Sequence, residues 1–355
     1  MKKHNFSAGP CILPQSVLQQ ASDAIKNFDD LNLSLIEISH RSKNFVAVMD
    51  EAIALVKELL SVPTGYSVLF LQGGASLEFL MVPFNLMKEG GKSAYLETGA
   101  WAKKARKESE QFGETLVVGS SANKNFNFIP KGYDVPAEAD YFHFTSNNTI
   151  FGTQIKNFEL AKNSLNVCDM SSDIFSRKIN VADFDLIYAG AQKNMGPAGT
   201  TLVIVKDEVL GHTGRHIPTM LDYRTHIKKE SMFNTPPVFP IYVSMLTLRW
   251  LKENGGVTWV EGINQQKADL LYNEIDRNPL FEGTAAVEDR SNMNATFVLT
   301  DESKKEAFDA LWKAAGVNGL NGHRDVCGYR ASMYNALPLE SVQVLVDAMQ
   351  QLENN

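Results

Sequence analysis

Apolar residues in the first two thirds of the chain form two kinds of segment that alternate. Short runs rich in β-branched and aromatic residues, bounded by Gly, Pro or polar residues, are typical of buried strands. We expect strands at residues 67–71, 93–97, 114–119, 141–145, 165–169, 185–189 and 200–205. Longer segments, in which apolar residues recur every three or four positions, favour helices at residues 15–27, 44–60, 240–253 and 257–276. Strands that alternate with helices indicate an α/β fold.

The pattern changes after Gly255 and Gly256, which interrupt the helical spacing. Beyond them we expect a strand at residues 295–300, a helix at 304–316 with Phe308, Leu311 and Trp312 facing inward, a short strand at 328–333 and a final helix at 340–352. The first residues are rich in turn formers and predict an extended arm. We therefore expect a large domain at residues 15–256, and a small α/β domain at residues 257–355 with residues 1–14 as its arm.

Composition narrows the class of protein. The 355 residues are 44% hydrophobic and 21% charged, which is ordinary for a globular protein, and the net charge of -7 argues against nucleic acid as a partner. No apolar run reaches the roughly 18 residues needed to span a bilayer, and the start lacks the apolar core of a secretion signal, so we expect a cytoplasmic protein without membrane contact. Cys11, Cys168 and Cys327 have no metal-ligand spacing, and no metal is expected.

Lys193 lies in a short loop between two of the predicted strands. Gly190, Gly196, Pro197 and Gly199 surround it and permit unusual backbone angles and the close approach of a ligand. A lysine in a partly desolvated cavity has a lowered pKa and acts as an amine nucleophile. A solvated lysine in a flexible hairpin is the competing interpretation, and the loop alone does not separate the two.

Three features lie where predicted strands end, which is where open α/β sheets bind ligands. The turn Gly73-Gly74-Ala75-Ser76 precedes an apolar helix, so that free backbone N–H groups and the positive helix end could receive a phosphate. Trp101 could stack on a flat cofactor, although a core tryptophan is the simpler interpretation. Thr149 follows the strand at residues 141–145. An ordinary strand-to-helix turn is an equal alternative for the Gly-Gly segment.

Asp169 closes the short buried strand at residues 165–169. A carboxylate there is costly unless it pairs with a cation or a strong donor. The simple explanation is that Asp169 caps a helix. The more specific explanation is that its carboxylate pairs with a protonated pyridine nitrogen.

Cationic residues gather in loops. His40 and Arg41 follow one apolar run, and a Gly-rich loop carries His323, Arg324 and Arg330. Such groups suit an anionic oxygen ligand, whereas a solvated polar turn is the alternative. A long excursion at residues 210–237 shows little periodicity and ends in prolines that present Asn234 and Thr235.

Together these features are what a pyridoxal-phosphate site requires. In eight short segments, the chain resembles the phosphoserine aminotransferases, a family of fold-type I, class V pyridoxal-phosphate enzymes. The matching stretches are residues 6–10, 40–41, 73–76, 169–172, 190–199, 233–237, 322–324 and 329–335. The resemblance implies a large domain with a mixed, mostly parallel seven-stranded sheet between helices, and a smaller C-terminal α/β domain.

The resemblance also implies residue roles. Lys193 would be the Schiff-base lysine and the acid/base, Asp169 would pair with the pyridine nitrogen, Trp101 would stack on the ring, and Thr149 would hydrogen-bond the ring oxygen. The cofactor phosphate would contact Ala75, Ser76 and Gln192, with Asn234 and Thr235 reaching in from the second subunit of a homodimer. Arg330 would bind the substrate α-carboxylate. The anion pocket for a phosphate or a side-chain carboxylate would consist of His40, Arg41, His323 and Arg324.

The implied reaction converts 3-phosphohydroxypyruvate and L-glutamate into O-phospho-L-serine and 2-oxoglutarate, in serine biosynthesis. Activity on 4-phosphohydroxy-L-threonine, in pyridoxine biosynthesis, is a further expectation. Ser76 stands where many family members carry arginine, which puts the strength of phosphate binding in doubt. The alternatives are a serine–glyoxylate-type aminotransferase, a cysteine desulfurase using Cys327, and a non-catalytic binding protein of the same fold.

Overall fold

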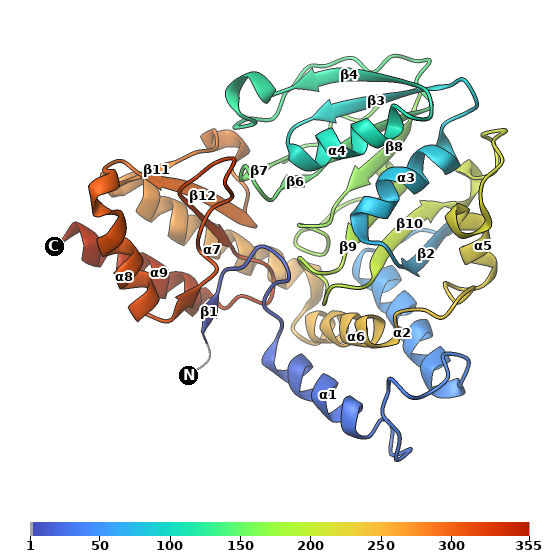
Figure 1. Cartoon of the computed structure of the whole chain (residues 1–355), viewed down its shortest axis with the longest axis horizontal. Helices are drawn as coiled ribbons and strands as arrows, with labels where there is room; N and C mark the ends of the chain where they lie inside the picture. Colours follow the sequence, from blue (N-terminus) through green and yellow to red (C-terminus); the bar gives the residue numbers. More distant parts are fainter. Residues whose placement is uncertain (1–2, 355) are drawn as a thin grey trace.

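The computed structural model describes residues 3–354 and is built around a seven-stranded sheet with the order β2-β10-β9-β8-β5-β3-β4 (Figure 1). Strand β10 is antiparallel to both neighbours, and the other pairs are parallel. The strands are β2 Tyr66–Leu71, β3 Lys92–Glu97, β4 Glu114–Ser120, β5 Tyr141–Thr145, β8 Leu165–Asp169, β9 Leu186–Gly190 and β10 Thr201–Lys206. All seven expected strands are confirmed, and each expected end lies within one residue of the observed end.

Helices cover both faces of this sheet. Neighbouring residues of each central strand point to opposite faces, so apolar residues on each face pack against a different set of helices. Phe70 of β2 and Ile204 of β10 belong to the same hydrophobic cluster as α2 and α6, whereas Leu69 and Val203 pack with α3. The helices around the sheet are α1 Gln15–Lys26, α2 Lys43–Leu59, α3 Gly74–Leu86, α4 Ala100–Ser109, α5 Tyr223–Lys228 and α6 Val238–Glu253. Both faces are thus buried at the centre of the sheet, where β9 and β10 are mostly apolar, whereas the edge strand β4 is partly exposed.

A second hydrophobic cluster lies beside the first, on the left in Figure 1. Its three-stranded antiparallel sheet has the order β11-β12-β14, and the arm joins it because β1 pairs in parallel with β13. Its elements are α7 Gly256–Arg277, β11 Phe281–Gly283, β12 Asn294–Leu299, α8 Lys305–Ala314, β13 Val317–Asn318, β14 Tyr329–Ser332, α9 Leu339–Glu353 and β1 His4–Asn5. In α8, Phe308 and Trp312 are buried as expected, and Leu311 is partly buried against them.

Helix α7 belongs to both clusters. Val257 and Val260 in its first turns pack with the large sheet, and Leu271 and Ile275 further along pack with the small one. The domain boundary between residues 256 and 257 therefore stays a prediction, since one continuous helix crosses it.

The sequence did not predict the structure inside two segments. The excursion at residues 210–237 contains α5, a six-residue helix capped by Asp222, with Tyr223 and His226 buried. A helix this short leaves no periodic pattern to detect. A small hairpin, β6 Asn147–Asn148 and β7 Thr153–Gln154, was also missed. The remaining short elements are 3-10 helices at Ala122–Lys124, Val181–Asp183, Asp207–Val209, Thr219–Leu221, Val287–Asp289 and Glu302–Lys304.

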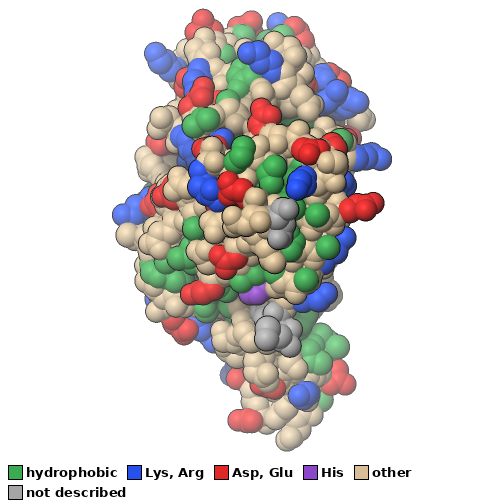
Figure 2. All heavy atoms as spheres, turned by 90° about the vertical axis from the view of Figure 1, so that its left-hand side faces the viewer, with side chains coloured by type: hydrophobic (Ala, Val, Ile, Leu, Met, Phe, Trp, Pro, Cys, Tyr) green, Lys and Arg blue, Asp and Glu red, His purple; other side chains and the backbone are tan. Residues whose placement is uncertain are grey.

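Within residues 3–354, no helix is long and apolar enough to cross a membrane. Figure 2 views the molecule from the side of the smaller cluster, and on this face lysine and arginine side chains alternate with aspartate and glutamate. The face drawn there thus mixes both signs of charge.

Candidate active site

Lys193 lies in the turn that joins β9 to β10, as the sequence predicted. Its Nζ donates a hydrogen bond of 2.8 Å to Thr149 Oγ1 and lies 5.1 Å from the centre of the Trp101 ring. Burial lowers the pKa of the Lys193 amine to about 8, and the nearby Asp169 opposes this shift. About a tenth of the amine is therefore neutral, and so nucleophilic, at about pH 7.

Asp169 is the last residue of β8, in register with Thr145 of β5 and Tyr188 of β9. Its carboxylate is buried, and Oδ1 accepts hydrogen bonds from the backbone N–H of Ser171 at 2.9 Å and from the Ser171 hydroxyl at 2.6 Å. Burial raises the pKa of Asp169, whereas Lys193 and Ser171 lower it. The second oxygen, Oδ2, has no donor among residues 3–354. One oxygen thus caps a turn and the other is left for a different donor, and its pairing with a pyridine nitrogen stays a prediction.

Ser171 supports this carboxylate and Asp173 lies near it as a second buried acid, and the sequence analysis singled out neither. The Ser171 hydroxyl also accepts a 3.1 Å hydrogen bond from the backbone N–H of Gly190, which ties Asp169 to β9. Asp173 is buried, accepts hydrogen bonds from Ser146 and Gln154, and raises the pKa of Lys193. The signal that could have found them is the polar run that follows a buried strand.

Trp101 and Thr149 come from different elements, and both lie beside the lysine. Trp101 is in the first turn of α4, and its indole Nε1 is buried without a hydrogen-bond partner in the described chain. Thr149 is buried in the loop between β6 and β7. The tryptophan therefore presents an aromatic face next to the amine rather than filling a core position remote from it.

Arg330 reaches the same site from β14 in the smaller cluster. Its Nη1 donates a 3.4 Å hydrogen bond to the backbone oxygen of Thr149, and its Nε is buried without a partner among residues 3–354. Burial lowers the pKa of Arg330, and its positive charge in turn lowers that of Lys193. An anionic ligand would meet a cation here whose hydrogen-bonding capacity is only partly used.

The N-terminal arm lies directly against the lysine loop. The backbone N–H of Cys11 donates to Gln192 O at 3.1 Å, and the Tyr334 hydroxyl donates to Ala8 O at 2.8 Å. Gly9 has a φ of +149°, and a Cβ there would lie 3.5 Å from Lys193 Cγ. The sequence predicted an arm on the body, but not that it lines this site.

The Gly-Gly turn has the geometry of an open helix start. Gly73 adopts a φ of +92°, and a Cβ at this position would lie 2.5 Å from atoms of the Leu77 side chain, so only glycine fits. Helix α3 begins at Gly74 without a side-chain cap. Its first N–H groups, including those of Ala75 and Ser76, are therefore available to an anion.

Several predicted site residues do not meet Lys193 within this chain. The Arg324 side chain is 91% exposed and lies 3.8 Å from Asp325, and His323 also pairs with Asp325, at 3.4 Å. Asn234 and Thr235 are exposed beside β2, where Gln72 donates to Thr235 O. His40 and Arg41 lie in the turn before α2, and His40 Nε2 is buried with no partner among residues 3–354. Their roles stay predictions.

The residues that do come together fit pyridoxal phosphate. They offer an amine of lowered pKa at Lys193, a carboxylate oxygen of Asp169 without a donor, an aromatic face at Trp101 and an open helix start for a phosphate. Each of these groups matches one part of that cofactor.

Comparison with known proteins gives full-length matches. Residues 3–345 match the family model for class-V aminotransferases. The phosphoserine aminotransferases of Flavobacterium psychrophilum and Flavobacterium johnsoniae are 68% and 66% identical, over 100% of this chain and 99% of each relative. Among solved structures, phosphoserine aminotransferase from Bacillus circulans subsp. alkalophilus is 43% identical with a TM-score of 0.96, covering 99% of both chains. The pyridoxal-phosphate-bound enzyme from Trichomonas vaginalis is 34% identical with a TM-score of 0.93, covering 98% of this chain and 100% of its own.

Proposed function

The chain belongs to the class-V aminotransferase family, and from this premise we propose that it is a pyridoxal-phosphate-dependent transaminase acting on phosphoserine. The reaction transfers the amino group of L-glutamate to 3-phosphohydroxypyruvate and gives O-phospho-L-serine and 2-oxoglutarate. The observation that carries the proposal is the position of Lys193 between Thr149, Trp101 and Arg330, in a chain that matches phosphoserine aminotransferases over its full length.

Pyridoxal phosphate, when bound, supplies an aldehyde that captures amines and a ring that takes up the electron pair released at the substrate Cα. Lys193 would hold the cofactor through its amine and, once displaced by the substrate amine, would move the proton at the substrate Cα. A pKa of about 8 allows the amine both to take and to give a proton near neutral pH. Asp169 Oδ2 would accept a hydrogen bond from the protonated ring nitrogen and keep that proton in place.

The other cofactor contacts would hold the ring and its phosphate. Trp101 would cover one ring face. The Thr149 hydroxyl, which accepts a hydrogen bond from Lys193 in this structure, would donate to the ring oxygen. The phosphate would accept hydrogen bonds from the N–H groups of Ala75 and Ser76 and from Gln192. With a neutral Ser76, this phosphate site relies on backbone N–H groups and the helix end rather than on a cation.

Substrate recognition would use two groups of cations. Arg330, beside Thr149, would bind the α-carboxylate. The second group would bind the substrate phosphate, or the side-chain carboxylate of glutamate, and consists of His40, Arg41, His323 and Arg324. None of these four residues contacts Lys193 within the described part of one chain. This supports a shared site, in which a second subunit contributes some of the four.

We infer a homodimer on the same ground. Asn234 and Thr235 are exposed and would reach the cofactor phosphate of the partner chain. Sedimentation of the purified protein should give twice the chain mass of 39.4 kDa. A monomer that turns over at full rate would contradict the shared site.

The alternatives are not favoured, because the curated relatives named above are phosphoserine aminotransferases over their full length. A desulfurase would use Cys327, which is exposed in the loop that also carries His323. Action on 4-phosphohydroxy-L-threonine and a cytoplasmic location stay predictions.

The experiment is single-turnover conversion of the bound cofactor by phosphoserine and by serine, followed by absorbance in a stopped-flow instrument. Loss of two hydrogen bonds to charged groups, each contributing about 1.5–3 kcal/mol, predicts that serine reacts roughly a hundredfold or more slowly. The Arg41→Gln variant should lose most of the preference for phosphoserine and keep its rate with serine. Equal rates with both amino acids in the unaltered protein would contradict the proposal.

A further inference from the structure

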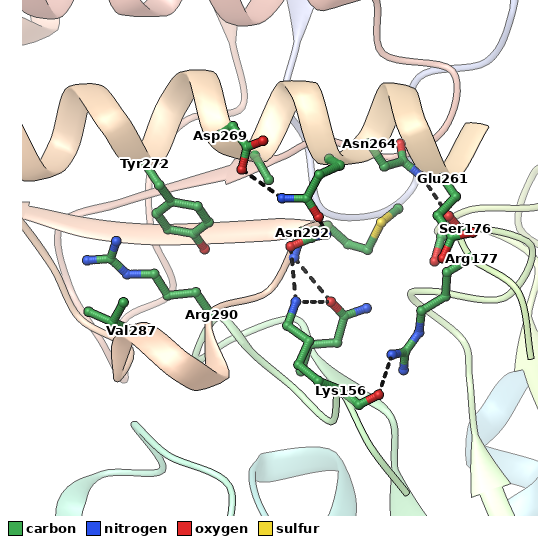
Figure 3. A pocket seen from close by; sticks show the side chains of 14 residues that line it. Lys156, Ser176, Arg177, Glu261, Asn264, Asp269, Tyr272, Val287, Arg290 and Asn292 are labelled. Carbon is green, nitrogen blue, oxygen red and sulfur yellow. Dashed lines mark hydrogen bonds between the residues drawn. The ribbon is translucent and has the colours of Figure 1, made fainter. Parts of the chain in front are cut away.

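A cavity of about 440 Å³ lies between α7 and the segment that follows β7 (Figure 3). Residues 287–293 close another side of it. None of the residues assigned above to the cofactor or the substrate lines this cavity. Its volume is in the range of about 300–1,000 Å³ that is common for small-molecule sites.

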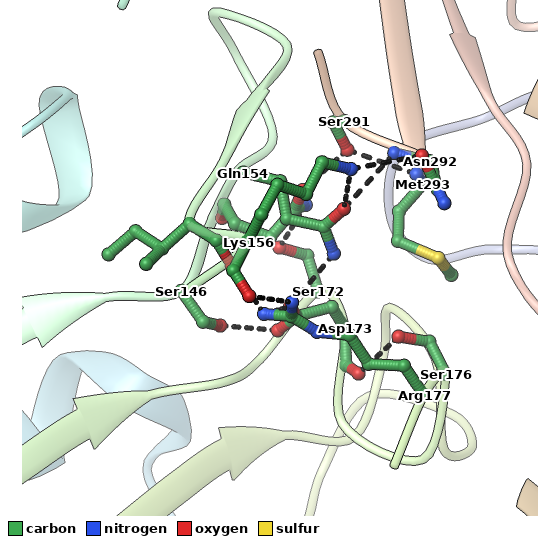
Figure 4. Close-up of polar contacts among 12 residues, drawn as sticks. Ser146, Gln154, Lys156, Ser172, Asp173, Ser176, Arg177, Ser291, Asn292 and Met293 are labelled. Atoms are coloured by element: carbon green, nitrogen blue, oxygen red, sulfur yellow. Dashed lines mark hydrogen bonds and ion pairs between the residues drawn. The ribbon is translucent and has the colours of Figure 1, made fainter. Parts of the chain in front are cut away.

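Lys156 provides a positive charge that no acid neutralises directly. Its Nζ donates to two neutral acceptors, Gln154 Oε1 at 2.9 Å and Asn292 Oδ1 at 3.0 Å (Figure 4). No carboxylate in the described chain lies within ion-pair distance of it. The Lys156 side chain as a whole is exposed at the edge of the cavity. Desolvation of its amine, with repulsion from Arg177, lowers the pKa of Lys156 to about 8. The third N–H of the ammonium is left for another acceptor, and a negative one would favour the charged form.

Arg177 enters the cavity from the turn after Asp173, but its charge is already used. Its Nη2 donates to Ile155 O at 2.7 Å and lies 3.5 Å from Asp173, and its Nη1 donates to Lys156 O. Arg290, on the opposite side, forms a two-pronged ion pair with Asp276. The free positive charge of the cavity therefore lies on Lys156.

Helix α7 supplies the opposite charge. Glu261 and Asp269 both line the cavity, about two turns apart along the helix (Figure 3). Glu261 is partly buried and has no hydrogen-bond or ion-pair partner among residues 3–354, and Asp269 accepts only from the neutral Gln265. Between them Asn264 is buried, and its Oδ1 has no partner in the same part of the chain. These oxygens are acceptors for a ligand that carries several N–H groups.

We propose that this cavity binds a small zwitterionic α-amino acid, with its carboxylate on Lys156 and its ammonium group on Glu261 of α7. A simple anion would satisfy Lys156 but would be repelled by Glu261 and Asp269, and a simple cation would meet the reverse problem. A ligand with both charges neutralises both walls.

Binding here would connect the two hydrophobic clusters of the molecule. Lys156 follows β7, which lies beside the large sheet, whereas Asn292 precedes β12 of the smaller sheet. A bound amino acid adds contacts between these parts, so it should raise the resistance of the protein to unfolding as its concentration rises.

The test measures the binding of radiolabelled glycine to the cofactor-loaded protein by equilibrium dialysis. Acetate and methylamine, which carry one charge each, are the competitors. The altered proteins are Lys156→Met and Glu261→Gln, and their matched controls are Lys178→Met and Glu306→Gln, whose side chains are exposed outside this cavity. Absorbance of the cofactor reports any glycine bound at Lys193 separately.

We expect one glycine per chain whose affinity falls at least tenfold in both altered proteins and in neither control. The cofactor signal should not change between them, and acetate or methylamine alone should compete at least tenfold more weakly than glycine. Glu261 has no partner to lose, so the Glu261→Gln protein keeps the test valid if Lys156→Met does not fold. Acetate binding as tight as glycine would indicate an anion site and overturn the proposal. Glycine binding unaffected by either substitution would overturn it as well.

Discussion

Replacing Ser171 with alanine removes one hydrogen bond from Asp169 and another from the neighbouring strand. The Ser171 hydroxyl donates to Asp169 Oδ1 at 2.6 Å and accepts from Gly190 N–H at 3.1 Å. A hydrogen bond to a charged group contributes about 1.5–3 kcal/mol, and a buried N–H left without a partner costs about 1–3 kcal/mol. We therefore expect Ser171→Ala to lower the free energy of unfolding by about 2.5–6 kcal/mol.

The substitution should also weaken binding of the cofactor, because Asp169 Oδ1 then accepts a hydrogen bond only from the backbone N–H of residue 171. If poorer orientation of Asp169 reduces the binding free energy of the cofactor by about 1.4 kcal/mol, the cofactor Kd rises tenfold. Unfolding in urea without the cofactor gives the first quantity, and equilibrium dialysis of pyridoxal phosphate gives the second.

Ser172→Ala is the matched control for this experiment. The Ser172 hydroxyl is equally buried and exchanges hydrogen bonds with Asn147, not with Asp169. It should lose comparable stability but keep its cofactor Kd. If Ser172→Ala weakens the cofactor as much as Ser171→Ala does, the positioning of Asp169 by Ser171 is refuted.

Three further predictions use other features of the fold. Because the pKa of Lys193 is about 8, attachment of pyridoxal phosphate to the cofactor-free protein, followed by absorbance, should become faster up to about pH 8 and level off above about pH 9. A rate that still rises steeply up to about pH 10 would contradict the lowered pKa. His143 is buried against Tyr188, and burial lowers its pKa to about 3, so the unfolded state binds more protons below pH 6.5. Between pH 6.5 and pH 4 the unaltered protein should lose about 3 kcal/mol more stability than His143→Gln, measured by urea unfolding, and parallel losses would be the opposing result. Gly73→Ala should lower stability by about 1–3 kcal/mol more than Gly90→Ala, since both glycines have positive φ but only Gly73 faces a side chain, and equal unfolding midpoints would show that Leu77 moves aside.

The parts of the site that lie at strand ends were predictable from the sequence. Asp169 closes a short apolar run, and Lys193 lies in the Gly-rich loop between two others. Parallel strands bring such ends to one edge of the sheet, so the pattern of strands already places them near each other. Thr149 and Trp101 follow from the same argument.

The remaining parts depend on tertiary packing that no local pattern encodes. Arg330 reaches Thr149 because the smaller cluster is docked beside the large sheet, and Gly9 lines the lysine loop because the arm pairs with β13. Conversely, a cationic loop predicts an anion site whether or not its side chains point inward, and Arg324 points to solvent in this chain. Helix α5 was missed because its six residues are shorter than two turns.

The most direct test of the proposed function follows nitrogen through complete turnover. The protein is incubated with ¹⁵N-labelled L-glutamate and 3-phosphohydroxypyruvate, and the products are analysed by mass spectrometry. We predict ¹⁵N-labelled O-phospho-L-serine with the unaltered protein, and none above background with Lys193→Ala. Absence of labelled phosphoserine from the unaltered protein, or equal formation by the Lys193→Ala variant, would contradict the account.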